Sequence, residues 1–356
     1  MLLLSVVTGL QGCFWLFPLT EPTEVRFATT PDNWKLALHR YKPEKISAEK
    51  EPLLLVPGFA SNRFAFDLAR DRSLALYLYE RGYDVWMLEL RGAGESTTPA
   101  YFDMGDWARD GIGPPPNYNF DTFVEIDAPT AIEYIRFETR NEKISWIGHS
   151  LGGMIGYAYL GLNPDTDAIR TFVALSAPSS FKLKSQALNF LLQFKGTVDW
   201  QPKIYTRLMA QSMANNLGWL DTRFDAIIWN NEVIDARTMS MAGYNMVTNL
   251  SGPLFNQMVG WMENGEFTSA DNAINYADNL DRIRVPTLLV SGSVDALCPP
   301  LVTRDTYEKI GTIEKVMRIA GKANGFTGDY GHMGVVIGNR AREDIYPVVF
   351  NWLEQH

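Results

Sequence analysis

Short runs of apolar residues recur along the chain, separated by long connections. Six such runs occupy residues 53–56, 83–90, 144–147, 171–175, 287–290 and 314–319. Most are apolar at consecutive positions rather than at alternate ones, which is typical of strands covered on both faces. The connections are long enough to hold crossover helices, which parallel strands require. The pattern therefore predicts an α/β fold with a mostly parallel central sheet and helices on both faces.

Two further patterns complete the predicted layers. The strand-like segments 24–28 and 34–39 are joined by the turn sequence Thr-Pro-Asp-Asn, and they predict a hairpin at one edge of the sheet. Apolar residues at helical spacing predict helices over residues 73–80, 123–137, 151–160 and 345–354.

One connection is much longer than the others. It runs from the strand ending near Ser176 to the strand starting at Thr287, and its patterning is helical and rich in Met and Trp. A structureless loop of that length is not expected inside a compact domain. We therefore predict a helical cap, or lid, over residues 181–281, inserted into a core domain formed by residues 21–180 and 282–356.

Composition narrows the class of protein. Of the 356 residues, 46% are hydrophobic and 21% are charged, as in soluble globular proteins with a large core. The formal net charge is −9, and no block of Lys or Arg could neutralise a row of phosphates, so a nucleic-acid partner is not expected. Two cysteines, Cys13 and Cys298, cannot form a disulfide framework. Four histidines without paired Cys/His spacing predict no metal site.

The first twenty residues contain no charged side chain and allow three interpretations. They could be a bacterial secretion signal, in which Leu-Gln-Gly-Cys at residues 10–13 resembles a lipobox and Cys13 is lipidated. They could instead be an uncleaved anchor, or a buried N-terminal segment of a cytoplasmic protein. An exported protein, membrane-anchored or periplasmic, is the expected localisation, with membrane association through the N-terminus and a cytoplasmic location as the alternative.

The candidate chemistry centres on Ser150. Residues 148–152 read Gly-His-Ser-Leu-Gly, which matches G-x-S-x-G between a predicted strand and a predicted helix. In such a tight turn the serine backbone is strained, and Gly148 and Gly152 avoid collisions that a Cβ would cause. In this context the motif indicates a nucleophile elbow rather than a simple glycine-rich turn.

A nucleophilic serine needs a histidine base and an acid that orients it. His39 lies in the predicted edge hairpin, His149 is inside the elbow, and His356 is the last residue of the sequence, so His332 is the predicted base. Asp295 follows the carboxyl end of a buried strand, the end at which α/β sheets build their sites, and it is the preferred acid. Asp329 is the alternative, because it is close to His332 in sequence.

The order Ser150, Asp295, His332 and several longer motifs resemble the α/β-hydrolase superfamily. The motifs are PLLLVPGFASNRFAFD, VWMLELRGAGES, YNFDTFVEIDAPTAIEYI, IGHSLGGMIGYAYL, VPTLLVSGSVDALCPP and YGHMG, and the third is similar to a segment of acid-lipase-like members. The resemblance implies an oxyanion hole made by the backbone N–H groups of Phe59 and Leu151. Pro57 stands where many relatives have histidine.

The resemblance implies a serine hydrolase of the lipase or esterase kind that needs no cofactor. A small-molecule or lipid ester with an apolar acyl or alcohol part is the expected substrate. The Met and Trp residues of the predicted cap would suit an apolar acyl-binding lid, although packing within the cap is favoured for any one of them. The alternatives are hydrolysis of amides, lactones or C–C bonds on the same fold, and a ligand-binding protein on a hydrolase scaffold.

Overall fold

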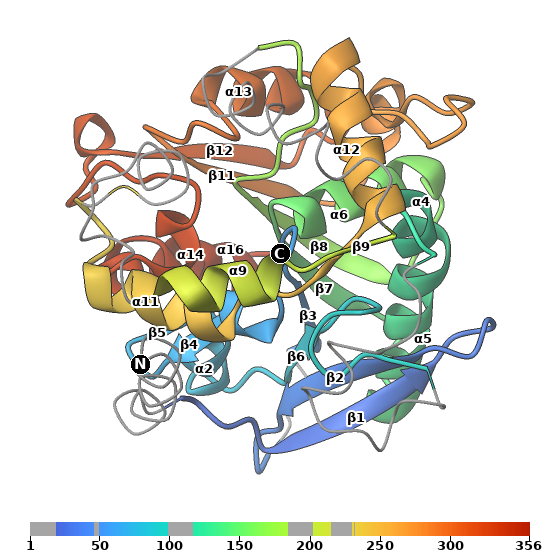
Figure 1. The fold of residues 1–356 in the computed structure, drawn as a ribbon. Helices are drawn as coiled ribbons and strands as arrows, with labels where there is room; N and C mark the ends of the chain where they lie inside the picture. The colour runs from blue at the N-terminus through green and yellow to red at the C-terminus, as the bar shows by residue number, and fades with distance from the viewer. Residues whose placement is uncertain (1–18, 46–49, 99–116, 184–201, 215–229, 231) are drawn as a thin grey trace, which may run out of the picture.

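A central eight-stranded sheet organises the computed structural model, which describes residues 19–45, 50–98, 117–183, 202–214, 230 and 232–356 (Figure 1). In spatial order the strands are β1 (Glu24–Thr29), β2 (Lys35–Tyr41), β6 (Val85–Leu88), β3 (Leu53–Val56), β7 (Ile144–His149), β8 (Ile169–Leu175), β11 (Thr287–Gly292) and β12 (Lys315–Ala320). β2 pairs antiparallel with both β1 and β6, and all other neighbours are parallel. The predicted fold class and the predicted edge hairpin are therefore confirmed.

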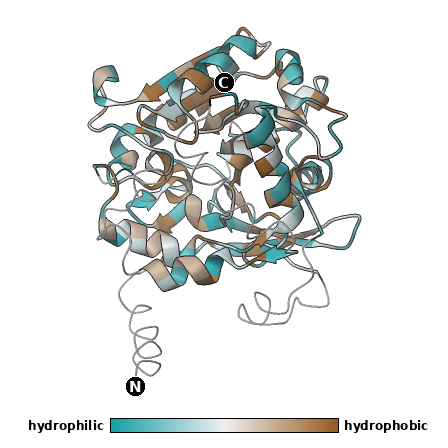
Figure 2. Cartoon of the chain, turned by 45° about the horizontal axis from the view of Figure 1, so that its top comes forward, coloured by the Kyte–Doolittle hydropathy of each residue, from teal (hydrophilic) through white to brown (hydrophobic). Residues whose placement is uncertain are grey.

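The inner strands are apolar at every position because both faces of the sheet are covered. Along β3, Leu54 and Val56 belong to one hydrophobic core, and Leu53 and Leu55 belong to a second core on the other face. The strands at the centre of the molecule are accordingly coloured as strongly hydrophobic in Figure 2. This arrangement explains why the sequence lacks the apolar–polar alternation of a one-sided sheet.

Helices cover the two faces of the sheet (Figure 1). On one face lie α4 (Phe120–Thr122), α5 (Ala128–Thr139) and α6 (Leu151–Leu162). On the other lie α2 (Leu74–Tyr79), α14 (Gly334–Ile337), α15 (Ala341–Asp344) and α16 (Tyr346–Leu353). Helix α13 (Pro300–Lys309) packs beside β11 and β12. A small hairpin, β4 (Asp67–Ala69) and β5 (Arg72–Ser73), precedes α2.

The helix predicted over residues 123–137 is interrupted at its start. Residues Phe123–Asp127 form a π-helical turn that leads into α5. Pro129 in the first turn of α5 has no N–H to donate to the carbonyl of Glu125, so regular α-helical bonding cannot run through this point. Asp127, at the end of the π turn, is buried and accepts hydrogen bonds from the backbone and side chain of Arg91 at 3.1 and 2.8 Å.

Within residues 181–281 the described elements are mainly helical. They are β9 (Lys203–Ile204), α9 (Thr206–Met213), α11 (Ala236–Asn245), β10 (Leu250–Ser251), α12 (Gly252–Asn264) and a 3-10 helix, η5 (Tyr276–Arg282). Strands β9 and β10 pair antiparallel, which the helical patterning did not predict because strands of two residues have no readable period. Trp200, Trp219 and Trp229 lie outside the described residues. The assignment of this stretch as a lid stays a prediction.

Candidate active site

Ser150 lies in the sharp turn between β7 and α6, and its backbone conformation is unusual. Its φ is 51° and its ψ is −117°, a combination that non-glycine residues rarely adopt. The Ser150 N–H donates a hydrogen bond of 2.9 Å to the carbonyl of Leu175 at the end of β8. The turn therefore places the serine at the carboxyl edge of the parallel strands, where α/β sheets build their sites.

Gly148 and Gly152 allow this turn to be tight. A Cβ on Gly152 would overlap the carbonyl oxygen of Val56 in β3, and a Cβ on Gly148 would overlap the carbonyl of Gly152. Both obstacles are main-chain atoms of packed elements and cannot rotate away as a flexible side chain can.

Gly152→Ala is therefore expected to lower the free energy of unfolding by about 3 kcal/mol, the upper part of the usual range for overpacking. Gly260→Ala is the matched control, because it adds the same methyl group to α12 where nothing lies within 4 Å. Alanine is the better helix former, so the control should be more stable than wild type by up to about 1 kcal/mol. Urea unfolding measures both changes, and similar effects at the two positions would contradict the steric account.

The His332 ring lies between Ser150 and Asp295. Its Nε2 is 2.9 Å from Ser150 Oγ, and its Nδ1 is 3.1 and 3.0 Å from the two carboxylate oxygens of Asp295. An ionised carboxylate only accepts, so Nδ1 carries the ring proton and Nε2 is free to accept the serine proton. His332 is 5% exposed and Asp295 3%, while Ser150 is half-buried. The fold thus brings together three residues that are far apart in sequence.

The loop after β11 holds Asp295 in place. Its Oδ1 accepts hydrogen bonds from the backbone N–H groups of Leu297 and Cys298 at 2.9 and 2.8 Å. Asp329, the alternative acid, instead accepts from Ser293 Oγ at 2.9 Å and from the Lys322 N–H at 3.0 Å. These hydrogen bonds, first that from Ser293, lower the pKa of Asp329. No hydrogen bond among the described residues joins Asp329 to His332.

His149, the residue before Ser150, makes a contact that sequence reasoning missed. Its Nε2 is 3.1 Å from the carbonyl oxygen of His332, so this nitrogen carries the proton and donates. The other ring nitrogen faces the loop after β3, because a Cβ on Gly58 would be 3.1 Å from His149 Nδ1. The ring fills the space between two loops next to Ser150. Burial, followed by the neighbouring His332 ring, lowers the pKa of His149 to about 3.

The lowered pKa of His149 predicts a pH-dependent stability. The unfolded chain binds a proton at this residue near its ordinary pKa of about 6.5, whereas the folded chain stays neutral there down to about 3. Between these values the unfolded state binds more protons, so stability falls as the pH is lowered. His149→Gln keeps an N–H donor but does not titrate. When the pH is lowered from about 7 to about 5, the free energy of unfolding of this variant should fall by roughly 2 kcal/mol less than that of wild type. Urea unfolding at both pH values measures this, and parallel losses would contradict a buried neutral ring.

The loop after β3 packs against the elbow and carries Phe59. A Cβ on Gly58 would be 3.1 Å from Ser150 Cβ, so this loop passes directly beside the serine. Leu151 is the first residue of α6, where a backbone N–H has no acceptor within the helix. No hydrogen bond of the described residues uses the Phe59 N–H. Neither of these two N–H groups donates to an acceptor in the hydrogen bonds of the described residues, and an oxyanion hole formed by them stays a prediction.

Helix α11 connects the two loops that flank Ser150. Beyond its C-terminal end, the carbonyl of Met246 accepts a 3.1 Å hydrogen bond from the N–H of Asn62, three residues after Phe59. Before its N-terminal end, the carbonyl of Val233 accepts a 2.7 Å bond from the N–H of Asn339, which follows α14 and the His332 loop. The position of α11 is thus tied to both loops.

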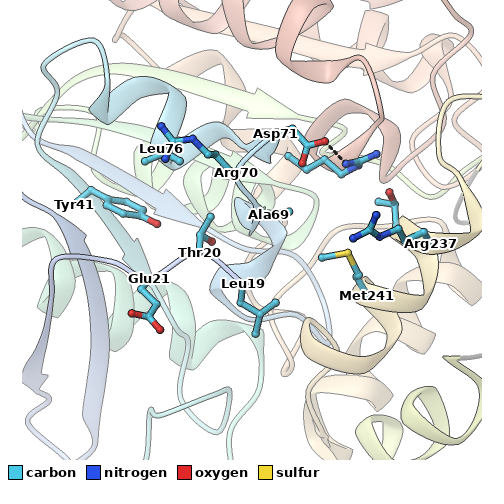
Figure 3. A pocket seen from close by; sticks show the side chains of 12 residues that line it. Leu19, Thr20, Glu21, Tyr41, Ala69, Arg70, Asp71, Leu76, Arg237 and Met241 are labelled. Atoms are coloured by element: carbon cyan, nitrogen blue, oxygen red, sulfur yellow. Dashed lines mark hydrogen bonds and ion pairs between the residues drawn. The ribbon is translucent and has the colours of Figure 1, made fainter. Parts of the chain in front are cut away.

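A cavity of about 490 Å³ lies beside α11 and shares no residue with the Ser150, His332 and Asp295 group. Figure 3 shows Arg237 and Met241 of α11 on one side of it, and Tyr41 and Glu21 on the other. The full lining is Leu19, Thr20, Glu21, Tyr41, Ala69, Arg70, Asp71, Arg72, Leu76, Arg237, Thr238 and Met241.

The N-terminal predictions concern residues that the structure does not describe. Residues 1–18, with Cys13, lie outside the described part, so a signal, anchor or lipidation site there stays a prediction. In the described part, no helix combines the length and the apolar character needed to cross a membrane. Nor do three His, Cys, Asp or Glu side chains gather there in a way that could hold a metal ion.

The sequence matches the model of the alpha/beta hydrolase fold over residues 51–334. The chain therefore belongs to this family, and within it the chain is lipase- and esterase-like. It is 24% identical to a probable lipase of Schizosaccharomyces pombe, over 99% of this chain and 82% of that protein. It is 30% identical to the gastric triacylglycerol lipase of Rattus norvegicus over 49% of this chain, and the match spans only 43% of that lipase.

Solved structures share the fold. A membrane phospholipase A, described as a bacterial virulence factor, has a TM-score of 0.59 at 17% identity and covers 99% of this chain and 91% of its own. A carboxylesterase structure from the thaumarchaeon Nitrososphaera gargenis has a TM-score of 0.61 at 17% identity, over 93% of this chain and 98% of its own.

Proposed function

We propose that the protein is a serine hydrolase that cleaves carboxylic esters through an acyl-enzyme on Ser150. The observation that carries the proposal is the 2.9 Å contact between Ser150 Oγ and His332 Nε2, with the opposite ring nitrogen on Asp295. A serine hydroxyl is a weak nucleophile until a base accepts its proton, and this arrangement supplies both the base and the group that fixes its tautomer.

In the acylation step, Ser150 Oγ forms a bond to the ester carbonyl carbon while its proton moves to His332 Nε2. The carbonyl electrons move to the oxygen and create a tetrahedral oxyanion. When the C–O bond to the alcohol breaks, the imidazolium gives its proton to the departing oxygen. Asp295 stabilises the imidazolium without itself becoming protonated.

The N–H groups of Phe59 and Leu151 hold the oxyanion. One is in the loop after β3 and the other is at the start of α6. Their positive ends face charge that develops only in the transition state, and one donor of this kind typically contributes about 10²- to 10³-fold in rate.

Water completes the cycle. His332 Nε2 removes a proton from a water molecule, whose oxygen attacks the acyl carbon, and the acid leaves as the Ser150 hydroxyl is restored. The same imidazole therefore acts as base in both attacks and as acid in both departures, without a metal ion or organic cofactor in any step.

We propose an ester with an apolar acyl or alcohol part as the substrate. The similarity to gastric triacylglycerol lipase and to a probable lipase of fission yeast supports this class. A p-nitrophenyl ester series from acetate to decanoate tests it, since each additional buried methylene should raise kcat/KM about fourfold until the acyl site is filled. The p-nitroanilides of the same acids separate ester from amide hydrolysis. Activity confined to acetate would contradict the apolar acyl site, and faster cleavage of the anilides would contradict ester specificity.

A further inference from the structure

Helix α9 turns its apolar side toward solvent. Leu208, Met209 and Met213 are 68%, 57% and 47% exposed, and Tyr205, directly before the helix, is 46% exposed. Positions 205, 208, 209 and 213 follow the spacing of three and four residues that places side chains on one side of a helix. These four residues are called the α9 apolar face below.

Hydrogen bonds hold α9 in this orientation. The Thr206 hydroxyl donates to the carbonyl of Thr248, and Gln211 Nε2 donates to the carbonyl of Tyr244 in α11 at 3.1 Å. An ordinary surface helix buries its apolar residues, whereas α9 exposes them and leaves Thr206, Arg207 and Gln211 half-buried. Its apolar face is therefore presented outward by specific polar contacts on the inner side.

The described segment that carries the α9 apolar face has basic side chains and no acidic ones. Residues 202–214 contain Lys203 and Arg207 but no Asp or Glu, in a chain whose formal net charge is −9. Lys203 Nζ lies 5.6 Å from the centre of the Tyr205 ring, at the start of the face. Basic groups bordering exposed apolar side chains are the combination that binds the surface of an anionic membrane.

A second protein molecule fits this face less well than a membrane does. The helix has eight residues, so it is about 12 Å long. A stable protein interface buries about 800 Å² on each partner, which four side chains on two helical turns cannot supply. Shallow insertion of a few apolar side chains into a lipid surface has no such requirement, particularly when a second contact shares the binding.

The position of α9 links it both to the active site and to the N-terminus. In Figure 1, α9 runs alongside α11, the helix that is hydrogen-bonded to both loops flanking Ser150. Leu19, at the start of the described chain, lines the cavity beside Arg237 and Met241 of α11 (Figure 3). Residues 1–18 carry no charged side chain. The uncharged N-terminal sequence thus joins the described chain next to the helix on which α9 packs.

We propose that the α9 apolar face docks on the surface of an anionic membrane. Tyr205, Leu208, Met209 and Met213 enter the interfacial layer, while Lys203 and Arg207 remain at the level of the lipid headgroups. This contact is separate from any contact that residues 1–18 make, and it orients the side of the molecule that carries α11 toward the lipid. The proposal concerns binding and does not depend on the proposed chemistry.

Co-sedimentation with phosphatidylcholine–phosphatidylglycerol vesicles tests the proposal. All proteins carry Ser150→Ala, so that hydrolysis cannot alter the vesicles and failure of the proposed chemistry cannot affect the result. Changing Leu208, Met209 and Met213 together to Gln should weaken vesicle binding by at least about tenfold. The control changes Phe137, Leu301 and Ile313 to Gln, which are also exposed apolar residues but lie on α5, on α13 and before β12, and it should bind as the parent does.

Each other outcome overturns the proposal. Equal binding of the α9 variant and the parent would assign membrane contact to another part of the chain. A drop in oligomer size for the α9 variant alone, measured by sedimentation velocity, would assign the face to a second copy. A melting temperature several degrees lower would mean that the face is packed within the chain. Equal binding of the parent to vesicles of phosphatidylcholine alone would remove the role of charge.

Discussion

Ser150→Ala is expected to lower kcat/KM for a p-nitrophenyl ester by at least about 10⁵-fold, because it removes the hydroxyl that forms the acyl bond. The loss should appear in kcat, because the variant keeps the rest of the substrate-binding site, including the backbone N–H donors. Ser150→Gly should be equally inactive and no less stable than wild type, because glycine adopts a φ of 51° without strain. Measuring both activity and stability of the two variants separates loss of the nucleophile from loss of the fold.

The neighbouring Ser176 provides a matched control. It also has a positive φ, 49°, and it follows β8 as Ser150 follows β7. Its hydroxyl is buried and has no hydrogen-bond partner among the described residues. Ser176→Ala should therefore keep kcat within a few-fold of wild type. A large loss in Ser176→Ala with activity retained in Ser150→Ala would reverse the assignment of the nucleophile.

Asp295→Asn is expected to lower kcat by about 10⁴-fold with little change in stability. The new amide oxygen can keep the hydrogen bonds from Leu297 and Cys298, so the loop is held as before. The amide N–H₂ then faces His332 Nδ1 and makes that nitrogen an acceptor, which places the ring proton on Nε2. An Nε2–H cannot take the proton of Ser150, so the base is disabled although the geometry is retained.

Asp329→Asn tests the alternative acid under the same conditions. This carboxylate is bonded to Ser293 and to the backbone of Lys322, and none of the described hydrogen bonds links it to His332. We expect kcat within a few-fold of wild type. Steady-state kinetics on the two Asn variants decides between the acids, and the opposite ranking would exclude Asp295 as the orienting group.

The parts of the site that the sequence predicted are those set by local chemistry. Gly148 and Gly152 indicate a tight turn that requires glycine at these positions, and the flanking apolar runs predict that this turn lies between a strand and a helix. Asp295 is predicted as the acid because it directly follows a buried strand, and parallel strands share a carboxyl edge. His332 is predicted by elimination among only four histidines, and the structure places its ring between Ser150 and Asp295.

Contacts between segments that are distant in sequence could not be predicted from the sequence. The sequence excludes His149 as the base because it lies inside the elbow, but its neighbours do not indicate that its ring bonds to the carbonyl of His332. The role of α11 as a tie between two loops depends on backbone carbonyls, which every residue possesses. The orientation of α9 was equally hidden, since the spacing of its apolar residues defines a face but not the direction in which that face points.

The central claim is that Ser150 Oγ is the nucleophile, and covalent labelling tests it most directly. A fluorophosphonate is attacked at phosphorus with loss of fluoride, so an activated serine gains the phosphonyl group. Peptide mass spectrometry of the labelled protein should locate the adduct on Ser150, rapidly in wild type and in Ser176→Ala, and not at all in Ser150→Ala. An unlabelled wild-type protein, or an adduct on another residue, would contradict the account.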